Sequence, residues 1–220
     1  MTAALLALAL AVGAPVAPAA AHDAAAHAAA APDAAALTRR VQAYYERTRD
    51  LEARFVQDYT YAVFGRTQTS SGTLRVKKPG KLRWDYAAPA RKTVLVNGNR
   101  LTQFEPEANQ VYVDDRFDLT ALSAAVTFLV GKGSLEKEFT ASADAEGRLV
   151  LTPRQADARV TQVVLTAGPD GQVTETRVED AQGNLNVLRF EDIRRNPGLA
   201  DAAFELKLPA DVHRVQAPGR

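Results

Sequence analysis

The feature that most constrains this chain is an alternation of apolar and polar residues, with a period of two, that runs from Phe55 almost to the C-terminus. In one stretch, Leu82, Trp84 and Tyr86 alternate with charged neighbours. Turn-forming sequences such as Gly168-Pro169-Asp170-Gly171 separate the alternating stretches at short spacing. Many short strands divided by turns are typical of an antiparallel β-sandwich or β-barrel, so we expect a mainly β protein.

The alternation predicts about ten or eleven strands in a single domain. The dipeptide Asn97-Gly98 predicts a type I′ hairpin turn after the apolar run that ends at Val96. The expected strands begin at Phe55 and include Leu74–Val76, Leu82–Tyr86, Val94–Val96, Leu101–Glu105, Val111–Asp114, Phe139–Ala143, Leu149–Pro153, Val160–Thr166, Val173–Asp180, Leu185–Arg194 and Phe204–Leu208.

One amphipathic helix is expected before the strands. Asp33 is its candidate N-cap, because an Asp side chain accepts hydrogen bonds from the free N–H groups of a first helical turn. Leu37, Val41 and Tyr44 then recur at helical spacing, and the pattern continues to Leu51.

The segment Leu119–Val130 interrupts the strands, because it is apolar on nearly every side. Gly131-Lys132-Gly133 follows and is typical of a helix end. A helix that is apolar all round has to be buried on more than one side. Two interpretations stay open: a core helix or strand, and a mobile lid over an apolar interior.

The N-terminal segment predicts export. Its first 36 residues contain 20 alanines and neither lysine nor arginine. The apolar run Ala3–Val12 is shorter than the ~20 residues that span a bilayer, and Ala19-Ala20-Ala21 is typical of a signal-peptidase site. We therefore expect residues 1–21 to be a signal peptide, residues 22–31 a flexible Ala-rich segment, and residues 32–220 one soluble domain. A basic n-region is missing, so a disordered Ala-rich tail is the alternative.

The composition excludes several kinds of catalytic and binding site. The chain has no cysteine, which excludes disulfides, thiolate metal sites and a cysteine nucleophile. The formal net charge is +1, so no basic excess indicates nucleic acid. His22, His27 and His213 lie in expected tails, where a Ser-His-Asp triad has no place. We expect no catalytic residues, no metal and no cofactor.

Clusters of charge have a simpler interpretation. The carboxylates of Asp114-Asp115 and Glu191-Asp192 come at strand ends, where solvated charge is usual. The basic cluster of Lys77-Lys78, Lys81 and Arg83 lacks the array of neighbouring stacking aromatic residues of an RNA-binding surface. It is expected to be a solvated hairpin turn, with an acidic partner as the alternative.

Two stretches, Gly72–Pro89 and Val94–Val113, resemble the outer-membrane lipoprotein carrier family, the LolA-like periplasmic carriers. That family has a strand that ends in a basic residue and proline, a turn, and a strand in which Trp alternates with other residues. The likeness continues through Phe55-Val56-Gln57, Leu149–Pro153 and the final Leu208-Pro209. It covers nearly the whole of the predicted mature chain.

The resemblance implies an incomplete, strongly curved antiparallel β-barrel, a half-shell of about 11 strands with a helical lid over an apolar cavity. The cavity would hold the acyl chains of lipoproteins. The implied role is that of a periplasmic, monomeric carrier. It would take lipoproteins from an inner-membrane ABC-type release complex to an outer-membrane receptor, with no enzymatic step.

The resemblance also assigns residues to the cavity. Lys78 stands where the family has an arginine that latches the lid, and a solvated lysine is the alternative. Trp84, the only tryptophan, matches a cavity-lining residue, although ordinary core packing fits it as well. The other expected lining residues are Leu74, Val76, Leu82, Val94, Val96, Phe104, Leu119, Leu122, Val126, Phe128 and Leu129. Which strand faces point inward stays open, because a slip of one residue inverts them.

Three other functions compete with lipoprotein transport. The same half-shell would carry another lipid or glycolipid. It would also serve a periplasmic regulatory module that senses lipids or peptides, although such proteins usually have an additional domain. A lipid-modifying enzyme is the least favoured, because the histidines are badly placed for it.

Overall fold

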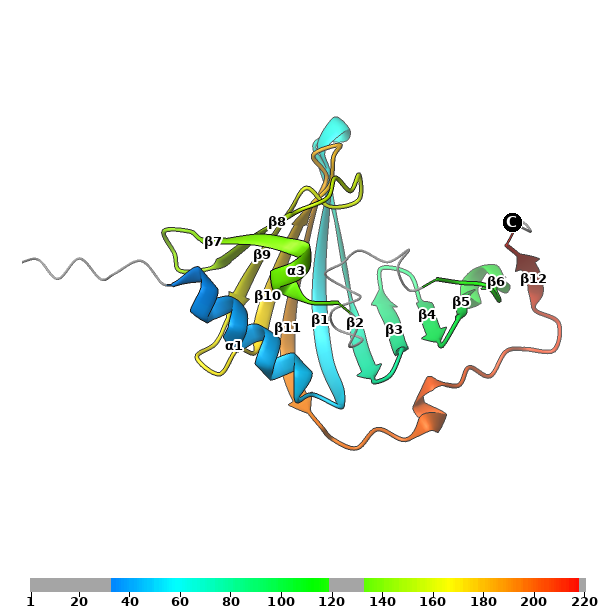
Figure 1. Ribbon diagram of the computed structural model, residues 1–220. Helices are drawn as coiled ribbons and strands as arrows, with labels where there is room; N and C mark the ends of the chain where they lie inside the picture. Colours follow the sequence, from blue (N-terminus) through cyan, green and yellow to red (C-terminus); the bar gives the residue numbers. More distant parts are fainter. Residues whose placement is uncertain (1–32, 119–132, 218–220) are drawn as a thin grey trace, which may run out of the picture. The chain divides into compact units, whose positions relative to one another are not determined.

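The computed structural model describes residues 33–118 and 133–217 of the chain. The chain divides into two compact units, Met1–Ala30 and Ala31–Arg220, and every described residue belongs to the second. A single twelve-stranded sheet dominates this second unit, in the order β12-β6-β5-β4-β3-β2-β1-β11-β10-β9-β8-β7 (Figure 1). Among the described residues the edge strands β12 and β7 are not paired with each other, so the sheet is open rather than closed into a barrel.

The strands are short except for the central ones. Their bounds are β1 Asp50–Tyr61, β2 Arg66–Lys77, β3 Lys81–Ala88, β4 Lys92–Asn97, β5 Arg100–Glu105, β6 Gln110–Asp114, β7 Phe139–Ala143, β8 Leu149–Pro153, β9 Gln162–Ala167, β10 Val173–Glu179, β11 Leu185–Arg195 and β12 His213–Gln216. The helices are α1 Ala34–Glu46 and α3 Leu135–Glu138, with 3₁₀ turns η1 Ala62–Phe64, η2 Pro106–Ala108 and η4 Asp201–Phe204. None of the helices in these described ranges is long and apolar enough to cross a membrane.

Helix α1 begins as the sequence predicts. The Asp33 side chain accepts a hydrogen bond from the Ala35 N–H at 2.9 Å and caps the first turn. The predicted end at Leu51 is wrong, because the helix stops at Glu46 and Leu51 lies in β1. The reason is tertiary: the Arg49 N–H donates to the Asn196 side chain, 2.7 Å away and distant in sequence.

The predicted strands are confirmed from Phe55 to Arg194, but the C-terminal one is wrong. Phe204 ends η4 and no strand follows it directly. The last strand is β12, four residues long, and it pairs with β6 in parallel. This makes it the one parallel neighbour in the sheet as described, since all other paired strands are antiparallel.

The hairpin at Asn97-Gly98 is present, but its predicted turn type is wrong. Asn97 pairs with Arg100, so the two central residues are Gly98 and Asn99. Of these, only Gly98 has a positive φ, at +65°. A type I′ turn requires positive φ at both central residues.

One face of the sheet, called the inner face here, carries α1 and the larger core. Helix α1 packs over β7 and β8 and contacts α3 (Figure 1). Its buried residues Leu37, Val41 and Tyr44 share one cluster with apolar side chains of β1 and β7 to β10. On β1 to β4 and β11 the inner face carries a second cluster of buried residues: Phe55, Leu74, Val76, Leu82, Val96 and Leu188.

The opposite, outer face is covered in part by the C-terminal segment. Val111 and Val113 of β6 form a buried cluster with Val212, and Leu208 packs against it. Turn η4 lies against β3 and β4, and Phe204 is buried there. The C-terminal residues therefore give the outer face an apolar core of its own.

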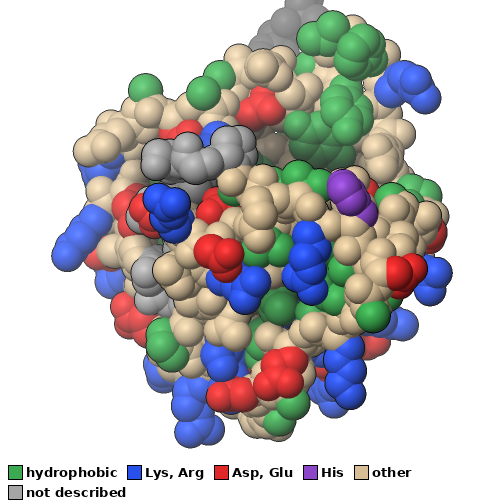
Figure 2. All heavy atoms as spheres, turned by 90° about the vertical axis from the view of Figure 1, so that its right-hand side faces the viewer, with side chains coloured by type: hydrophobic (Ala, Val, Ile, Leu, Met, Phe, Trp, Pro, Cys, Tyr) green, Lys and Arg blue, Asp and Glu red, His purple; other side chains and the backbone are tan. Residues whose placement is uncertain are grey.

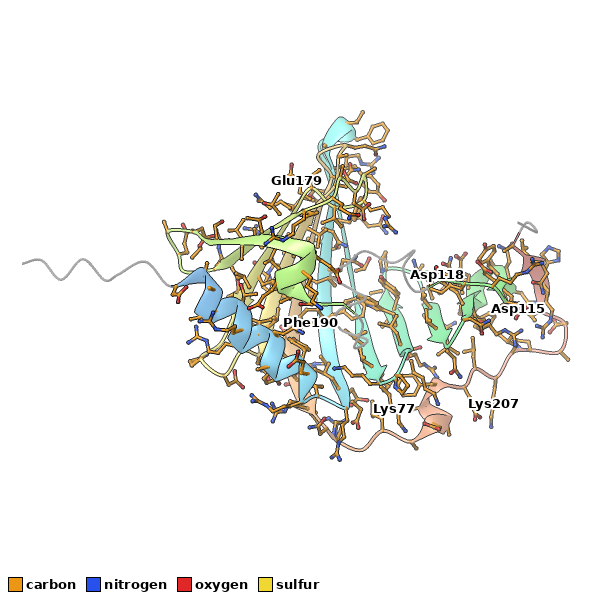
Figure 3. All side chains as sticks on the ribbon, in the orientation of Figure 1. Lys77, Asp115, Asp118, Glu179, Phe190 and Lys207 are labelled. Atoms are coloured by element: carbon orange, nitrogen blue, oxygen red, sulfur yellow. The ribbon has the colours of Figure 1, made fainter. Side chains whose placement is uncertain are left out.

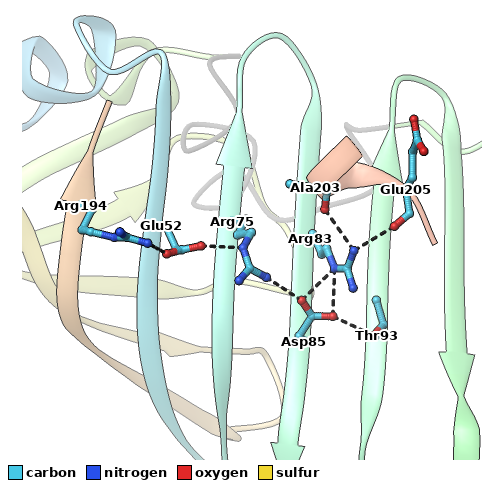
Figure 4. Close-up of polar contacts among 8 residues, drawn as sticks. All are labelled: Glu52, Arg75, Arg83, Asp85, Thr93, Arg194, Ala203 and Glu205. Atoms are coloured by element: carbon cyan, nitrogen blue, oxygen red, sulfur yellow. Dashed lines mark hydrogen bonds and ion pairs between the residues drawn. The ribbon is translucent and has the colours of Figure 1, made fainter. Parts of the chain in front are cut away.

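A ladder of ion pairs crosses the outer face over four neighbouring strands (Figure 4). Glu52 on β1 pairs with Arg194 of β11 and with Arg75 of β2, the latter at 2.6 Å. Arg75 and Arg83 both reach the Asp85 carboxylate of β3, at 3.0 and 2.8 Å. Arg83 also donates to two carbonyl groups of the C-terminal segment, those of Ala203 and Glu205. The ladder thus ties the central strands to the C-terminal segment.

Candidate functional site: the inner face of the open sheet

Six of the predicted cavity residues lie together on the inner face. Their strands pair in register: Trp84 of β3 pairs with Leu74 on one side and Val94 on the other, and Leu82 pairs in the same way with Val76 and Val96. Directly paired residues project to the same side of a sheet, so the six form two parallel rows across β2, β3 and β4. Leu74, Val76, Leu82 and Val96 are buried, whereas Trp84 and Val94 keep part of their surface exposed.

An aromatic cluster lies beside these rows. The Phe55 ring meets the Trp84 ring edge to face at 5.7 Å and the Tyr86 ring at 5.2 Å. The indole Nε1 of Trp84 is buried, and it has no hydrogen-bond partner among residues 33–118 and 133–217. An indole N–H usually finds a partner when buried. Within the described part of the chain, Trp84 therefore presents a donor without an acceptor on an otherwise apolar surface.

Sequence reasoning missed several members of this surface. Phe55 and Tyr86 belong to it, and for Tyr86 the alternation with Leu82 and Trp84 was a sufficient signal. Phe190 packs against both inner-face clusters, and Figure 3 places it on β11. Only the sheet order brings Phe190 to this place, because β11 is far from β2 and β3 in the sequence.

Phe104 does not belong to this face, and its expected place in the cavity is a correction. On β5 the residue paired with Val96 is Leu101, so Leu101 points inward and Phe104, three residues on, points outward. There Phe104 packs against the cluster of Val111 and Val113. The outer face of β5 and β6 is apolar because the C-terminal segment covers it, which the local sequence does not reveal.

Lys78 is bound to helix α1. Its ammonium donates a hydrogen bond to the Tyr45 carbonyl at 2.5 Å, in the last turn of the helix. Burial lowers the pKa of Lys78 below the ordinary lysine value, and the charge of Glu46 opposes this shift. A cation at a helix C-terminus is favoured by the helix dipole. Lys78 therefore fixes the end of α1 to the β2–β3 hairpin, and it is not simply solvated.

The expected lid lies outside the described residues. This concerns the segment Leu119–Val130 and the five lining residues predicted within it: Leu119, Leu122, Val126, Phe128 and Leu129. Their roles stay predictions. Of the residues just before the segment, Phe117 packs against the inner-face cluster that contains Trp84.

A groove continues the inner face toward the η1 end of the strands. Its volume is about 460 Å³, and its lining changes from aliphatic to aromatic and polar: Gln57, Tyr59, Tyr61, Gln68, Ser70, Tyr86, Pro89, Ala90, Arg91, Lys92, Glu105, Glu107 and Ala108. Desolvation raises the pKa of Tyr86 to about 12. The Lys92 ammonium lies 4.5 Å from the centre of the Tyr86 ring. The inner face thus has an apolar half and a half that offers hydrogen bonds.

A smaller cavity lies under α1, where Tyr45, Lys78 and Phe190 meet. Its free volume is about 20 Å³, enough for one water molecule. Burial also raises the pKa of Tyr45 well above its ordinary value. Over the ranges 33–118 and 133–217, no three His, Cys, Asp or Glu residues are grouped so that they could hold a metal ion.

Comparison with known proteins gives consistent results. A family model described as "Outer membrane lipoprotein carrier protein LolA" matches residues 46–207. An outer-membrane lipoprotein carrier protein of Alkalilimnicola ehrlichii is 31% identical over 186 residues, which cover 84% of this chain and 86% of that protein. The protein of the same name from Dechloromonas aromatica is 32% identical over 82% of this chain and 88% of its own length. Among solved structures, an uncharacterized conserved protein from Thermus thermophilus matches with a TM-score of 0.51 at 12% identity, covering 84% of this chain and 99% of that one, which shows a shared fold.

Proposed function

Because the chain belongs to the LolA family of outer membrane lipoprotein carrier proteins, we propose that it is a periplasmic carrier that shields the acyl chains of lipoproteins. It would receive them from an inner-membrane ABC-type release complex and deliver them to an outer-membrane receptor. It would act as a monomer and without catalysing a reaction.

The observation that carries the proposal is the apolar half of the inner face. Five aliphatic side chains of β2 to β4 and an aromatic cluster lie there side by side, on an open sheet whose edges do not pair among the described residues. Burial of one methylene is worth ~0.8 kcal/mol, so a chain of about sixteen carbons costs roughly 12 kcal/mol in water. A lipoprotein needs such a surface to cross an aqueous compartment.

We assign acyl-chain binding to the six inner-face residues of β2, β3 and β4: Leu74, Val76, Leu82, Trp84, Val94 and Val96. Contacts of this kind are non-directional, so they hold many chain lengths with similar strength. Weak specificity suits a carrier that must release its cargo to a receptor without an energy source. The Nε1 donor of Trp84, which has no partner in the described part of the chain, is the exception, because it would favour a ligand carbonyl near this point once the surface opens.

Lys78 is assigned the part of a latch. It holds the last turn of α1 against the β2–β3 hairpin, and α1 covers part of the same inner face. When the latch is closed, α1 buries its own apolar residues on the sheet. Opening it would expose this surface to acyl chains, so the two states exchange one apolar contact for another.

The test is release of lipoproteins from spheroplasts. The protein purified from a periplasmic extract is mixed with spheroplasts and ATP, and the soluble fraction is probed for lipoproteins bound to it. Binding of a fluorescent fatty-acyl probe is measured in parallel. ATP-dependent release in a one-to-one complex is expected. Probe binding without release would favour a carrier of another lipid, and failure of both would refute the proposal.

A further inference from the structure

The large hydrophobic side chains that the described part of the chain exposes are all at one place. They are Tyr61, Val63 and Phe64, with exposed fractions of 39%, 82% and 73%. The three lie at the tip of the long β1–β2 hairpin, in and beside η1 (Figure 1). Figure 2 shows hydrophobic side chains gathered at the top of the molecule as drawn, where this tip lies. Exposed apolar side chains that cluster are a sign of an interaction site, whereas single ones are ordinary.

The tip has a defined conformation rather than that of a loose loop. Gly65 closes η1 in the left-handed region, with φ +56°, and its N–H donates to the Ala62 carbonyl. The Ala62 N–H donates to the Asn184 side chain at 3.1 Å. Asn184 is itself buried and bound to Asp180 in the β10–β11 turn. A second turn therefore braces the hairpin, and the exposed Val63 and Phe64 are held outward.

The charges of the hairpin itself also have a clear pattern, while the carboxylates of Glu179 and Asp180 belong to the bracing β10–β11 turn. From Tyr59 to Gly72 the single charged residue is Arg66, and the segment has no carboxylate. The Tyr59 and Tyr61 rings lie 4.7 Å apart just below the tip. Aliphatic and aromatic side chains, flanked by tyrosine and a basic residue, are the composition that binds the interfacial region of a lipid bilayer.

From these observations we infer that the β1–β2 tip docks on phospholipid bilayers, with Val63 and Phe64 inserted among the acyl chains at the interface and Tyr61 and Arg66 at headgroup level. A narrow tip with two strongly exposed side chains falls short of the ~800 Å² per partner of a standard protein interface. A bilayer needs no complementary shape, so a small apolar projection is sufficient for weak, reversible docking.

Docking of the tip on a bilayer would assist the transfer of acyl chains, an inference that rests on the proposed function. Tyr59 and Tyr61 line the groove that continues the inner face. A docked tip would therefore bring the mouth of this groove to the membrane surface. Acyl chains would then move between bilayer and carrier without a long path through water.

The test is binding to vesicles of phosphatidylethanolamine with phosphatidylglycerol, using the protein purified from periplasmic extracts. The double variant Val63→Ser/Phe64→Ser is compared with the wild type by sedimentation. Both side chains are exposed, so folding should be unchanged, and circular dichroism checks it. We expect a drop in the partition coefficient of about tenfold or more, because removal from water of even half of each side chain is worth roughly that much.

A second readout reports insertion directly. Phe64→Trp in a Trp84→Phe background places the only tryptophan at the tip, and Glu146→Trp in the same background is the matched control on the exposed β7–β8 turn. We expect a blue shift and quenching by brominated lipids for the tip reporter and neither for the control. Vesicles of phosphatidylcholine alone should bind more weakly if Arg66 meets anionic headgroups.

Three results would overturn the inference: no sedimentation of the wild type, equal sedimentation of the double variant, or equal spectra for the two reporters. If the double variant loses only release from spheroplasts and not vesicle binding, the tip docks on a protein instead. Fatty-acyl probe binding is expected to be unaffected by the double variant. A failure of bilayer docking is therefore distinguishable from a failure of the proposed carrier function.

Discussion

Trp84→Phe tests whether the indole donor on the inner face is truly without a partner. The substitution keeps an aromatic ring beside Phe55 and removes the Nε1 group together with part of the ring system. The lost apolar contact is equivalent to between one and two methylenes, about 1–1.5 kcal/mol. An unsatisfied buried donor costs about 1–3 kcal/mol, and its removal recovers this amount. The expected net change thus lies between a loss of about 0.5 and a gain of about 2 kcal/mol.

The assay is urea unfolding followed by far-ultraviolet circular dichroism, because the variant has no tryptophan left to report. Phe55→Leu is the matched control. Phe55 is buried and makes two edge-to-face contacts, so its loss should cost about 2–3 kcal/mol. If Trp84→Phe destabilises the protein as much as Phe55→Leu does, the indole N–H has a partner, and the assignment of an unused donor is wrong.

Three further predictions concern the sheet, the latch and the ion-pair ladder. Gly72→Ala should cost about 3 kcal/mol or more in thermal unfolding, because its Cβ would lie 1.9 Å from the Asp85 carbonyl oxygen; a loss below about 1 kcal/mol would contradict this close approach. Lys78→Met should lower the free energy of unfolding in urea by about 1–2 kcal/mol through the lost bond to the Tyr45 carbonyl, and Lys78→Arg should recover part of it. Hydrogen bonds from Arg194 and then Arg75 lower the pKa of Glu52, so the stability they give is present above the ordinary pKa of 4.5 and is lost as pH falls through the folded value. Glu52→Gln should flatten the acid limb of the stability–pH curve, and an unchanged limb would show that other carboxylates control it.

Local sequence patterns predicted much of the fold. The Asp33 cap and the recurrence of apolar residues predicted the start of α1, because capping and helical spacing are properties of a few neighbouring residues. The same holds for the strands from β1 to β11, whose alternation needs only one solvated and one buried side. The end of α1 was misplaced, because the strand beginning at Asp50 is fixed by Asn196 from the far end of the chain.

For the candidate site too, local patterns predicted some features, and contacts between distant segments decided the others. Leu82 and Trp84 were placed on one surface by alternation alone, and pairing confirms that Leu74 and Val96 share it. Phe104 was misassigned, because an apolar residue on β5 packs against an apolar cluster on either face once the C-terminal segment covers the outer one.

The sequence by itself therefore determined the class of the protein: a ladder of short antiparallel strands after one capped helix, without cysteine and with likeness to the LolA-like carriers. Those features depend on spacing and composition within a few residues of each other. Only the tertiary structure decided which faces point inward, that Phe190 packs against both inner-face clusters, and that Lys78 binds the end of α1. These features depend on strand order and on contacts between distant segments. An alternation with a period of two shows that a strand has two different faces, but it does not show which face another segment will cover.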